Sequence, residues 1–154
     1  VSDLAAVLVE TRLPAYRLVL EVTETVLVKA SPENNALLEQ IKGLGVRLAI
    51  DDFGTGYSSL GYLQRFPVDV VKLDRSFIEP LGQNPKQRVL VRGIIELAHN
   101  LGLQTVAEGV ERAEQAAELR AMGCQVAQGY CFARPLKPER IEELLGARPE
   151  WAAR

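Results

Sequence analysis

Side chains that bind zinc or take part in nucleophilic catalysis are scarce in this chain. Its 154 residues include one histidine and two cysteines. His99 stands alone in a strongly helical stretch. A zinc site needs several His or Cys ligands, and a Ser–His–Asp triad needs a histidine beside a nucleophile, so both are disfavoured. Cys124 and Cys131 have no metal-type spacing, and we expect two buried free thiols in a reducing cytoplasm.

An excess of positive charge and a long apolar run are also missing. Lysine and arginine number 18 against 20 acidic residues. This balance argues against a basic groove for DNA or RNA, while a small phosphorylated ligand held by a metal stays compatible with it. No apolar run reaches transmembrane length and no signal segment opens the chain, so we expect no membrane insertion in this segment. A hydrophobic share of 47% and a charged share of 25% are typical of one globular domain.

Strand-like and helix-like segments alternate along the chain. Ser31-Pro32-Glu33 is a strong helix start, and Gly43 and Gly45 end that helix. The strands are continuous apolar runs, as expected when both faces of a sheet are buried. Five strand–helix units predict an α/β fold with a parallel sheet and right-handed crossovers. The expected strands are 17–21, 47–50, 68–73, 104–107 and 125–127, and the expected helices are 3–12, 31–43, 59–66, 87–100, 112–122 and 137–145.

The most informative stretch runs from Leu48 to Leu60. An apolar strand leads there into a loop that carries Asp51, Asp52 and two glycines. Adjacent carboxylates repel each other, and a divalent cation would remove that cost. A solvated turn is the alternative, because Asp, Gly, Thr and Ser are all common in turns. This stretch alone leaves both interpretations open.

Polar side chains also follow the other predicted strands at the points where they end. The carboxyl ends of parallel strands converge on one rim, where α/β proteins bind ligands. Two divalent cations would neutralise the carboxylates gathered there, and such metal pairs suit in-line displacement at phosphorus. A structural network of ion pairs is the alternative. The residues concerned are Glu21, Asp51, Asp52, Lys72, Asp74, Glu108 and Gln128.

Five segments of the chain form a recognisable set. They are LEVTE at 20–24, DDFGTGYSSL at 51–60, VKLD at 71–74, VAEGVE at 106–111 and AQGY at 127–130, the last followed by RPL at 134–136. Together and in this order they resemble the EAL-domain phosphodiesterases, which hydrolyse the bacterial second messenger cyclic di-GMP to linear pGpG. The longest segment is similar to the signature loop of that family.

The resemblance implies a TIM-type barrel with two Mg²⁺ or Mn²⁺ ions on its C-terminal rim, in a bacterial cytoplasm or beside a membrane anchor elsewhere in the parent protein. Glu21 and Asp51 would bind metal, with Asp51 bridging the ions, and Asp52 would hold the second ion. Glu108 would bind the second metal and act as general base, and Lys72 would contact the attacking water and the scissile phosphate. The other implied site residues are Asp74 in the metal motif, Glu24 as the anchor of the signature loop, and Glu111, Gln128 and Pro135 as supports of substrate or loop.

The chain departs from the family in one large respect. The Glu-Ala-Leu motif that names the family is absent, and so is the Asn that supplies a further metal ligand. A complete eight-fold barrel takes about 250 residues, so we expect a partial EAL domain at 1–146, its C-terminal five units, and a tail at 147–154. A partial barrel leaves strand edges open near 18–20 and near Val126, where we expect a homodimer or other self-association.

Two other functions compete with hydrolysis. A catalytically silent member of the family would bind cyclic di-GMP, or only partner proteins, as a receptor module. Its mark would be lost metal ligands, yet every ligand position within the present span is retained. A five-stranded phosphoacceptor receiver also places an acid pair, an Asp and a Lys on one rim, but its acid pair would not lie on the second strand. Metal-dependent hydrolysis is therefore the function we expect.

We predict that the 154-residue chain alone has little or no hydrolase activity, because the first metal would lack two ligands. Hydrolysis of cyclic di-GMP with Mg²⁺ is measured for the chain alone and after addition in trans of an upstream segment carrying Glu-Ala-Leu and the Asn. Activity is expected only with the added segment. Rapid turnover by the chain alone would contradict the prediction.

Overall fold

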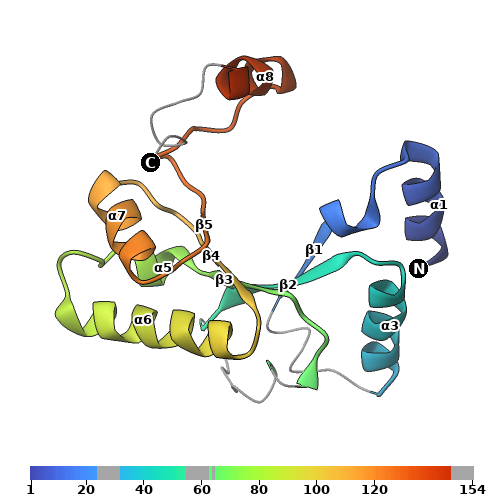
Figure 1. The fold of residues 1–154 in the computed structure, drawn as a ribbon, viewed down its shortest axis with the longest axis horizontal. Helices are drawn as coiled ribbons and strands as arrows, with labels where there is room; N and C mark the ends of the chain where they lie inside the picture. Colours follow the sequence, from blue (N-terminus) through green and yellow to red (C-terminus); the bar gives the residue numbers. More distant parts are fainter. Residues whose placement is uncertain (24–31, 55–62, 64, 147–154) are drawn as a thin grey trace.

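Five parallel strands form one sheet in the computed structural model, which describes residues 1–23, 32–54, 63 and 65–146 (Figure 1). Helices lie between the strands in the chain. The strands are β1 (Val19–Thr23), β2 (Arg47–Phe53), β3 (Val70–Leu73), β4 (Gln104–Ala107) and β5 (Val126–Ala127). The helices are α1 (Ser2–Thr11), the 3-10 helix η1 (Ala15–Arg17), α3 (Pro32–Gly43), α5 (Arg75–Ile78), α6 (Pro85–Asn100), α7 (Ala113–Ala121) and α8 (Pro138–Gly146).

The strands lie side by side in their order along the chain, β1-β2-β3-β4-β5, and all four neighbouring pairs are parallel. Sequential order is the order of a barrel built from strand–helix units. A receiver-type domain has the order 2-1-3-4-5 instead. The α/β fold with parallel units is therefore confirmed, and the receiver alternative is wrong.

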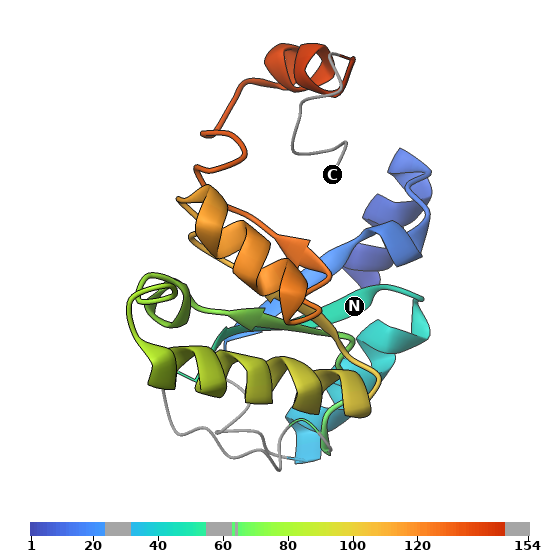
Figure 2. The same ribbon diagram turned by 60° about the vertical axis from the view of Figure 1, so that its left-hand side comes forward.

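The longest helix shows why the element prediction succeeds. Asn84 caps α6 by accepting a hydrogen bond from the Lys86 amide at 3.0 Å, and Pro85 stands at the first helical position. The helix therefore begins two residues before the predicted start at Gln87. Val91 and Ile95 are fully buried and belong to the apolar cluster that includes residues of β3 and β4. Figures 1 and 2 show α6 lying along one side of the sheet and α8 standing apart from it.

One helix of the structure was not predicted, and one predicted helix is not tested. The short helix Arg75–Ile78 was not predicted, because four residues are too few to show a helical period. The helix predicted at 59–66 falls largely outside the described residues.

Burial varies from the centre of the sheet to its edges. The central strand β3 is buried along its whole length, as the apolar runs predict. The edge strand β1 alternates between exposed and half-buried residues, and β5 does the same. The prediction that both faces of every strand are buried is therefore wrong for the two edge strands, β1 and β5.

A network of polar side chains ties the N-terminal ends of the strands together. The Lys42 ammonium lies 2.7 Å from both carboxylate oxygens of Asp69, and Asp69 also accepts the Leu48 amide at 2.8 Å. Arg47 at the start of β2 donates to Gln104 at the start of β4 at 2.8 Å. These contacts fix the end of the sheet opposite to the predicted site.

The two cysteines are free and half-buried, so the prediction of free thiols holds while that of full burial is wrong. Burial raises the pKa of the Cys124 thiol above its ordinary value. Within the described residues, no helix is both long and apolar enough to cross a membrane.

Gly129 allows the segment after β5 to contact the segment after β4. A Cβ atom there would lie 2.2 Å from the Val110 carbonyl oxygen, and the residue has φ 154°. We predict that Gly129→Ala lowers the free energy of unfolding by about 2 to 5 kcal/mol, through backbone overlap and strain. Urea denaturation followed by circular dichroism measures the change.

Gly93→Ala is the matched control. Gly93 lies in α6 and its Cβ would have no atom within 4 Å, so the substitution should raise stability by about 0.5 to 1 kcal/mol. Equal effects of the two substitutions would show that the close approach at Gly129 does not constrain the fold.

Candidate metal centre

One lysine stands at the centre of the site. The Nζ atom of Lys72, on β3, lies 2.7 Å from Glu21 on β1, 2.8 Å from Asp51 on β2 and 2.8 Å from Glu108, directly after β4. Lys72 is 6% exposed. Side chains from four neighbouring strands thus meet at the C-terminal ends, as the convergence of parallel strands predicts.

The strand geometry explains why these side chains share a face. Successive residues of a strand point to opposite sides, so Leu48 and Ile50 of β2 pack in the helix-facing core while Asp51 points to the other face. On β3, Val71 and Leu73 belong to the cores and Lys72 points away from them. The apolar side chains on one face of these strands therefore pack in the core, and the polar side chains on the other face form the site.

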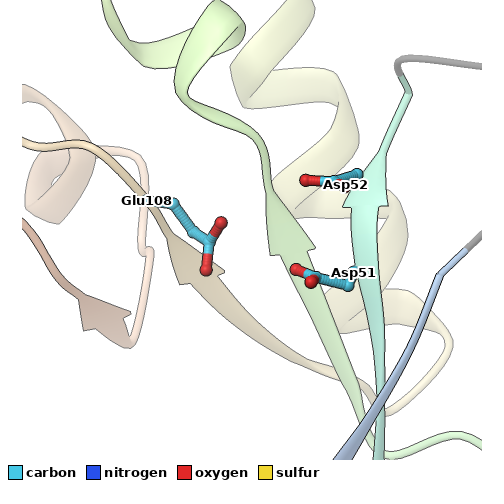
Figure 3. Close-up of side chains that lie close together, drawn as sticks. All are labelled: Asp51, Asp52 and Glu108. Atoms are coloured by element: carbon cyan, nitrogen blue, oxygen red, sulfur yellow. The ribbon is translucent and has the colours of Figure 1, made fainter.

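An irregularity at the end of β2 brings two adjacent acids to the same side. The pairing of β2 with β3 shifts register between Ile50 and Phe53, and Asp52 has φ 53°. This bulge cancels the normal alternation, and Figure 3 shows Asp51 and Asp52 both pointing toward Glu108. The prediction that the acid pair lies in a loop is corrected, since β2 continues through both residues to Phe53.

Asp51, Asp52 and Glu108 form a group that fits a metal ion. One carboxylate oxygen from each lies within 4.8 Å of the others. Hard divalent cations bind carboxylate oxygens, and an ion among these three would have a ligand from each. Asp51 and Glu108 are half-buried and Asp52 is exposed, so the group is open to solvent on one side. The donor chemistry of these residues therefore fits Mg²⁺ or Mn²⁺.

Electrostatics explains the protonation of Lys72. Burial alone would lower the pKa of this ammonium, but hydrogen bonds to Asp51, Glu108 and Glu21 outweigh burial and raise the pKa well above the ordinary lysine value. Lys72 is therefore a permanent cation at neutral pH. It cannot serve as a general base there.

Gln128 orients the predicted base. Its Nε2 donates to Glu108 Oε1 at 2.6 Å, and its own backbone amide donates to the Ala107 carbonyl at 2.8 Å. Glu108 Oε1 also receives the Lys72 ammonium. Two donors thus fix one oxygen of this carboxylate.

The remaining predicted residues lie around this group or outside it. Asp74 caps α5 by accepting from the Ser76 amide at 3.0 Å. Hydrogen bonding from Ser76, first from its side chain and then from its amide, lowers the pKa of the Asp74 carboxyl. Glu111 forms an ion pair with Arg75 at 3.0 Å. Glu24 falls outside the described residues. The structure brings together six of the predicted residues: Glu21, Asp51, Asp52, Lys72, Glu108 and Gln128. Asp74 and Glu111 instead pair with residues of α5.

A pocket of about 560 Å³ adjoins the carboxylates. Glu111, Gln128 and Pro135, all predicted to support substrate or loop, line it together with Glu108. Arg75, Arg134 and Tyr130 also line this pocket. The Arg134 guanidinium lies 4.7 Å from the centre of the Tyr130 ring. Tyr130 and Arg134 lie in the recognised segments 127–130 and 134–136 but were given no role, and Arg75 was not singled out at all.

Sequence reasoning also missed Phe77 and Gln115. A Cβ atom on Gly54 would lie 2.5 Å from the Phe77 ring, so this ring packs directly on the backbone after β2. Gln115 is 2% exposed and is the third residue of α7. A glutamine at that position is a known N-terminal helix signal, and it was the one available clue.

Known proteins resemble this chain in sequence and in structure. An EAL domain family model matches residues 1–135. The cyclic di-GMP phosphodiesterase NbdA of Pseudomonas aeruginosa is 46% identical over 147 residues, which cover 96% of this chain and 19% of that protein. The first three curated relatives are covered over 17% to 19% of their own length.

Solved structures agree with this likeness. The crystal structure of the EAL domain of Mycobacterium smegmatis DcpA superposes with a TM-score of 0.88 at 42% identity, over 95% of this chain and 66% of that chain. BlrP1 of Klebsiella pneumoniae, in a manganese and cyclic di-GMP complex, superposes with a TM-score of 0.81 at 33% identity, over 87% of this chain and 34% of that chain.

Lys72→Met keeps the apolar stem and removes the charge between the three carboxylates. We expect the free energy of unfolding in EDTA to fall by about 2 to 3 kcal/mol, less than for a fully buried pair because Glu21 is half exposed. A raised pKa stabilises the fold fully below the ordinary lysine pKa, and this stability is lost only as pH rises through the higher folded value. The deficit should therefore stay constant from about pH 6 to about pH 9.

Urea denaturation across that pH range measures the deficit. Lys86→Met, at an exposed position in the first turn of α6, is the control and should change stability by less than about 0.5 kcal/mol. A deficit that vanished toward pH 9 would argue against a permanent ammonium at residue 72.

Proposed function

The chain belongs to the EAL domain family, and on that premise we propose that its parent protein hydrolyses cyclic di-GMP to linear pGpG with two divalent metal ions. By family it is an EAL-type phosphodiesterase. The observation that carries the proposal is the group formed by Asp51, Asp52 and Glu108, whose oxygens lie within 4.8 Å of one another at one rim of the sheet.

The metal in this proposal is Mg²⁺ or Mn²⁺. Glu21 and Asp51 would hold the first ion, and Asp51, Asp52 and Glu108 would hold the second. Asp74 would add a further carboxylate to the site. When bound, the metal pair supplies positive charge to the phosphate oxygens and acidifies a bound water. The carboxylate-only donor set and the manganese complex of BlrP1 support this choice.

Lys72 and Glu108 have different roles in this proposal: Lys72 stabilises negative charge, and Glu108 transfers a proton. Lys72 is a permanent cation, so it contributes positive charge beside the attacking water and the scissile phosphate. Glu108 is the general base. Its Oε1 already accepts from Lys72 and Gln128, and we assign the proton of the attacking water to Oε2.

The pocket beside Glu108 fits a nucleotide ligand. Arg75 and Arg134 offer guanidinium groups for a phosphate or a guanine carbonyl, and Tyr130 offers an aromatic face. Gln128 lines both this pocket and the carboxylate group, so a ligand held there would have its phosphate beside the metal ligands. BlrP1 was solved with cyclic di-GMP bound, which supports the same ligand for this chain.

A cytoplasmic location and self-association complete the proposal. Among the strands that the structure describes, β1 and β5 form the two edges of the sheet, and an edge strand can pair with another chain. A second copy of this chain is the proposed partner. Membrane anchoring, where it occurs, would come from another part of the parent protein.

Separate titrations distinguish an enzyme from a silent receptor. We expect Mn²⁺ to bind the chain in the absence of cyclic di-GMP. Asp52→Asn should weaken Mn²⁺ binding by roughly 10-fold or more, because Asn accepts the left-handed backbone at φ 53° and removes only the charge. Isothermal calorimetry with Mn²⁺ and with cyclic di-GMP, each alone, measures both affinities.

Asp3→Asn is the control, since Asp3 lies in the first turn of α1 and away from the carboxylate group. It should leave Mn²⁺ binding unchanged. Binding of cyclic di-GMP without any binding of Mn²⁺ would instead support the silent receptor.

A further inference from the structure

Gln115 is a buried amide that no part of the proposed chemistry uses. Its Oε1 accepts the backbone amides of Glu111 at 3.0 Å and Arg112 at 2.9 Å. Its Nε2 donates to the Ile78 carbonyl at 2.9 Å and approaches the Glu79 carbonyl at 3.4 Å. One side chain thus joins the segment after β4 to the end of α5.

The segment that Gln115 holds is the one that carries Glu108. The Glu108 amide donates to the Leu73 carbonyl at 3.0 Å, and the Val110 amide donates to the Gln128 carbonyl at 3.1 Å. These two bonds attach the segment to β3 and to the residue that follows β5. The bonds of Gln115 attach it in a third direction, to α5.

Helix α5 also contacts the segment that follows Asp51 and Asp52. Its Phe77 ring packs on the backbone of Gly54, two residues beyond Asp52. At its other contact, α5 meets the segment after β4. The aliphatic part of Arg75 lies against Gly109, where a Cβ atom would be 2.6 Å from Arg75 Cγ. The short helix therefore lies between the segment after β2 and the segment after β4.

We propose that Gln115 is a positioning residue, which sets the separation of Glu108 from Asp51 and Asp52 by locking the segment 108–112 onto α5. The amide is the side chain that this task requires, because it must accept from two N–H groups and donate to a carbonyl at once. A buried position keeps water from replacing these bonds. The attachment of segment 108–112 to α5 follows from the geometry alone. The effect on metal binding rests on the proposed function of the site.

The experiment compares two substitutions of glutamine by the similarly sized methionine in the full chain. Gln115→Met removes the hydrogen bonds of Gln115. The Arg112 guanidinium still donates to the Glu79 carbonyl at 3.1 Å and to the Leu81 carbonyl at 2.9 Å, so the variant tests the part of the attachment that Gln115 provides. Gln104→Met removes one side-chain hydrogen bond, from Arg47, at the opposite end of β4. Amide hydrogen exchange and chemical shifts at Glu108, Glu111 and Arg112 are measured by NMR, and the affinity for Mn²⁺ is measured by calorimetry.

Gln115→Met should abolish the exchange protection of the Glu111 and Arg112 amides, shift the Glu108 resonance and weaken Mn²⁺ binding about 10-fold. Gln104→Met should leave all three unchanged, although it also loses a hydrogen bond. Unchanged resonances and exchange at 108–112 in folded Gln115→Met would overturn the proposal, whether or not the unsubstituted chain binds Mn²⁺. Absence of Mn²⁺ binding by the unsubstituted chain would count against the metal site alone.

Gln115→Glu provides the test if the methionine variant does not fold. A carboxylate still accepts from Glu111 and Arg112 but cannot donate to Ile78. We expect protection of the two amides to persist while the Glu108 resonance shifts and Mn²⁺ binding weakens. A Glu108 resonance and an Mn²⁺ affinity equal to those of the unsubstituted chain would contradict the role of α5.

Discussion

The ion pairs of Lys72 with three carboxylates are the interaction on which the rest of the site depends. Glu21, Asp51 and Glu108 come from segments far apart in sequence, and their negative charges would separate in the absence of a cation. The ammonium can reach all three only because β3 lies between β2 and β4, with β1 one strand further. Sequential strand order is therefore an electrostatic requirement of this site as well as a property of the fold.

Much of the fold follows from local signals in the sequence. The existence of α6 could be predicted from its helical pattern, although its start at Asn84-Pro85 lies two residues before the predicted start at Gln87. Helix α5 could not, because its four residues form no period and its cap, Asp74, was interpreted by its chemistry alone. Exposure of β1 also depends on its place at the edge of the sheet, which no single segment encodes.

The site divides in the same way. Asp51, Lys72 and Glu108 were predicted because each follows or ends a strand and parallel strands end at one rim. The bulge that turns Asp52 to the same side depends on how β2 pairs with β3, and the pairing is a tertiary property. Gln115 was missed for a similar reason: its partners Ile78 and Glu79 are 37 and 36 positions away and are backbone carbonyls, which leave no trace in the sequence.

The left-handed backbone at Asp52 has a consequence for the residues that this position tolerates. Among residues with a side chain, Asn and Asp adopt this conformation most readily, because a short polar group can bond locally to the backbone. A proposed metal ligand must also carry a negative charge, which Asn lacks. Glutamate has the charge, but its longer side chain lacks that local bond. Two unrelated demands, one conformational and one chemical, therefore select the same amino acid at position 52.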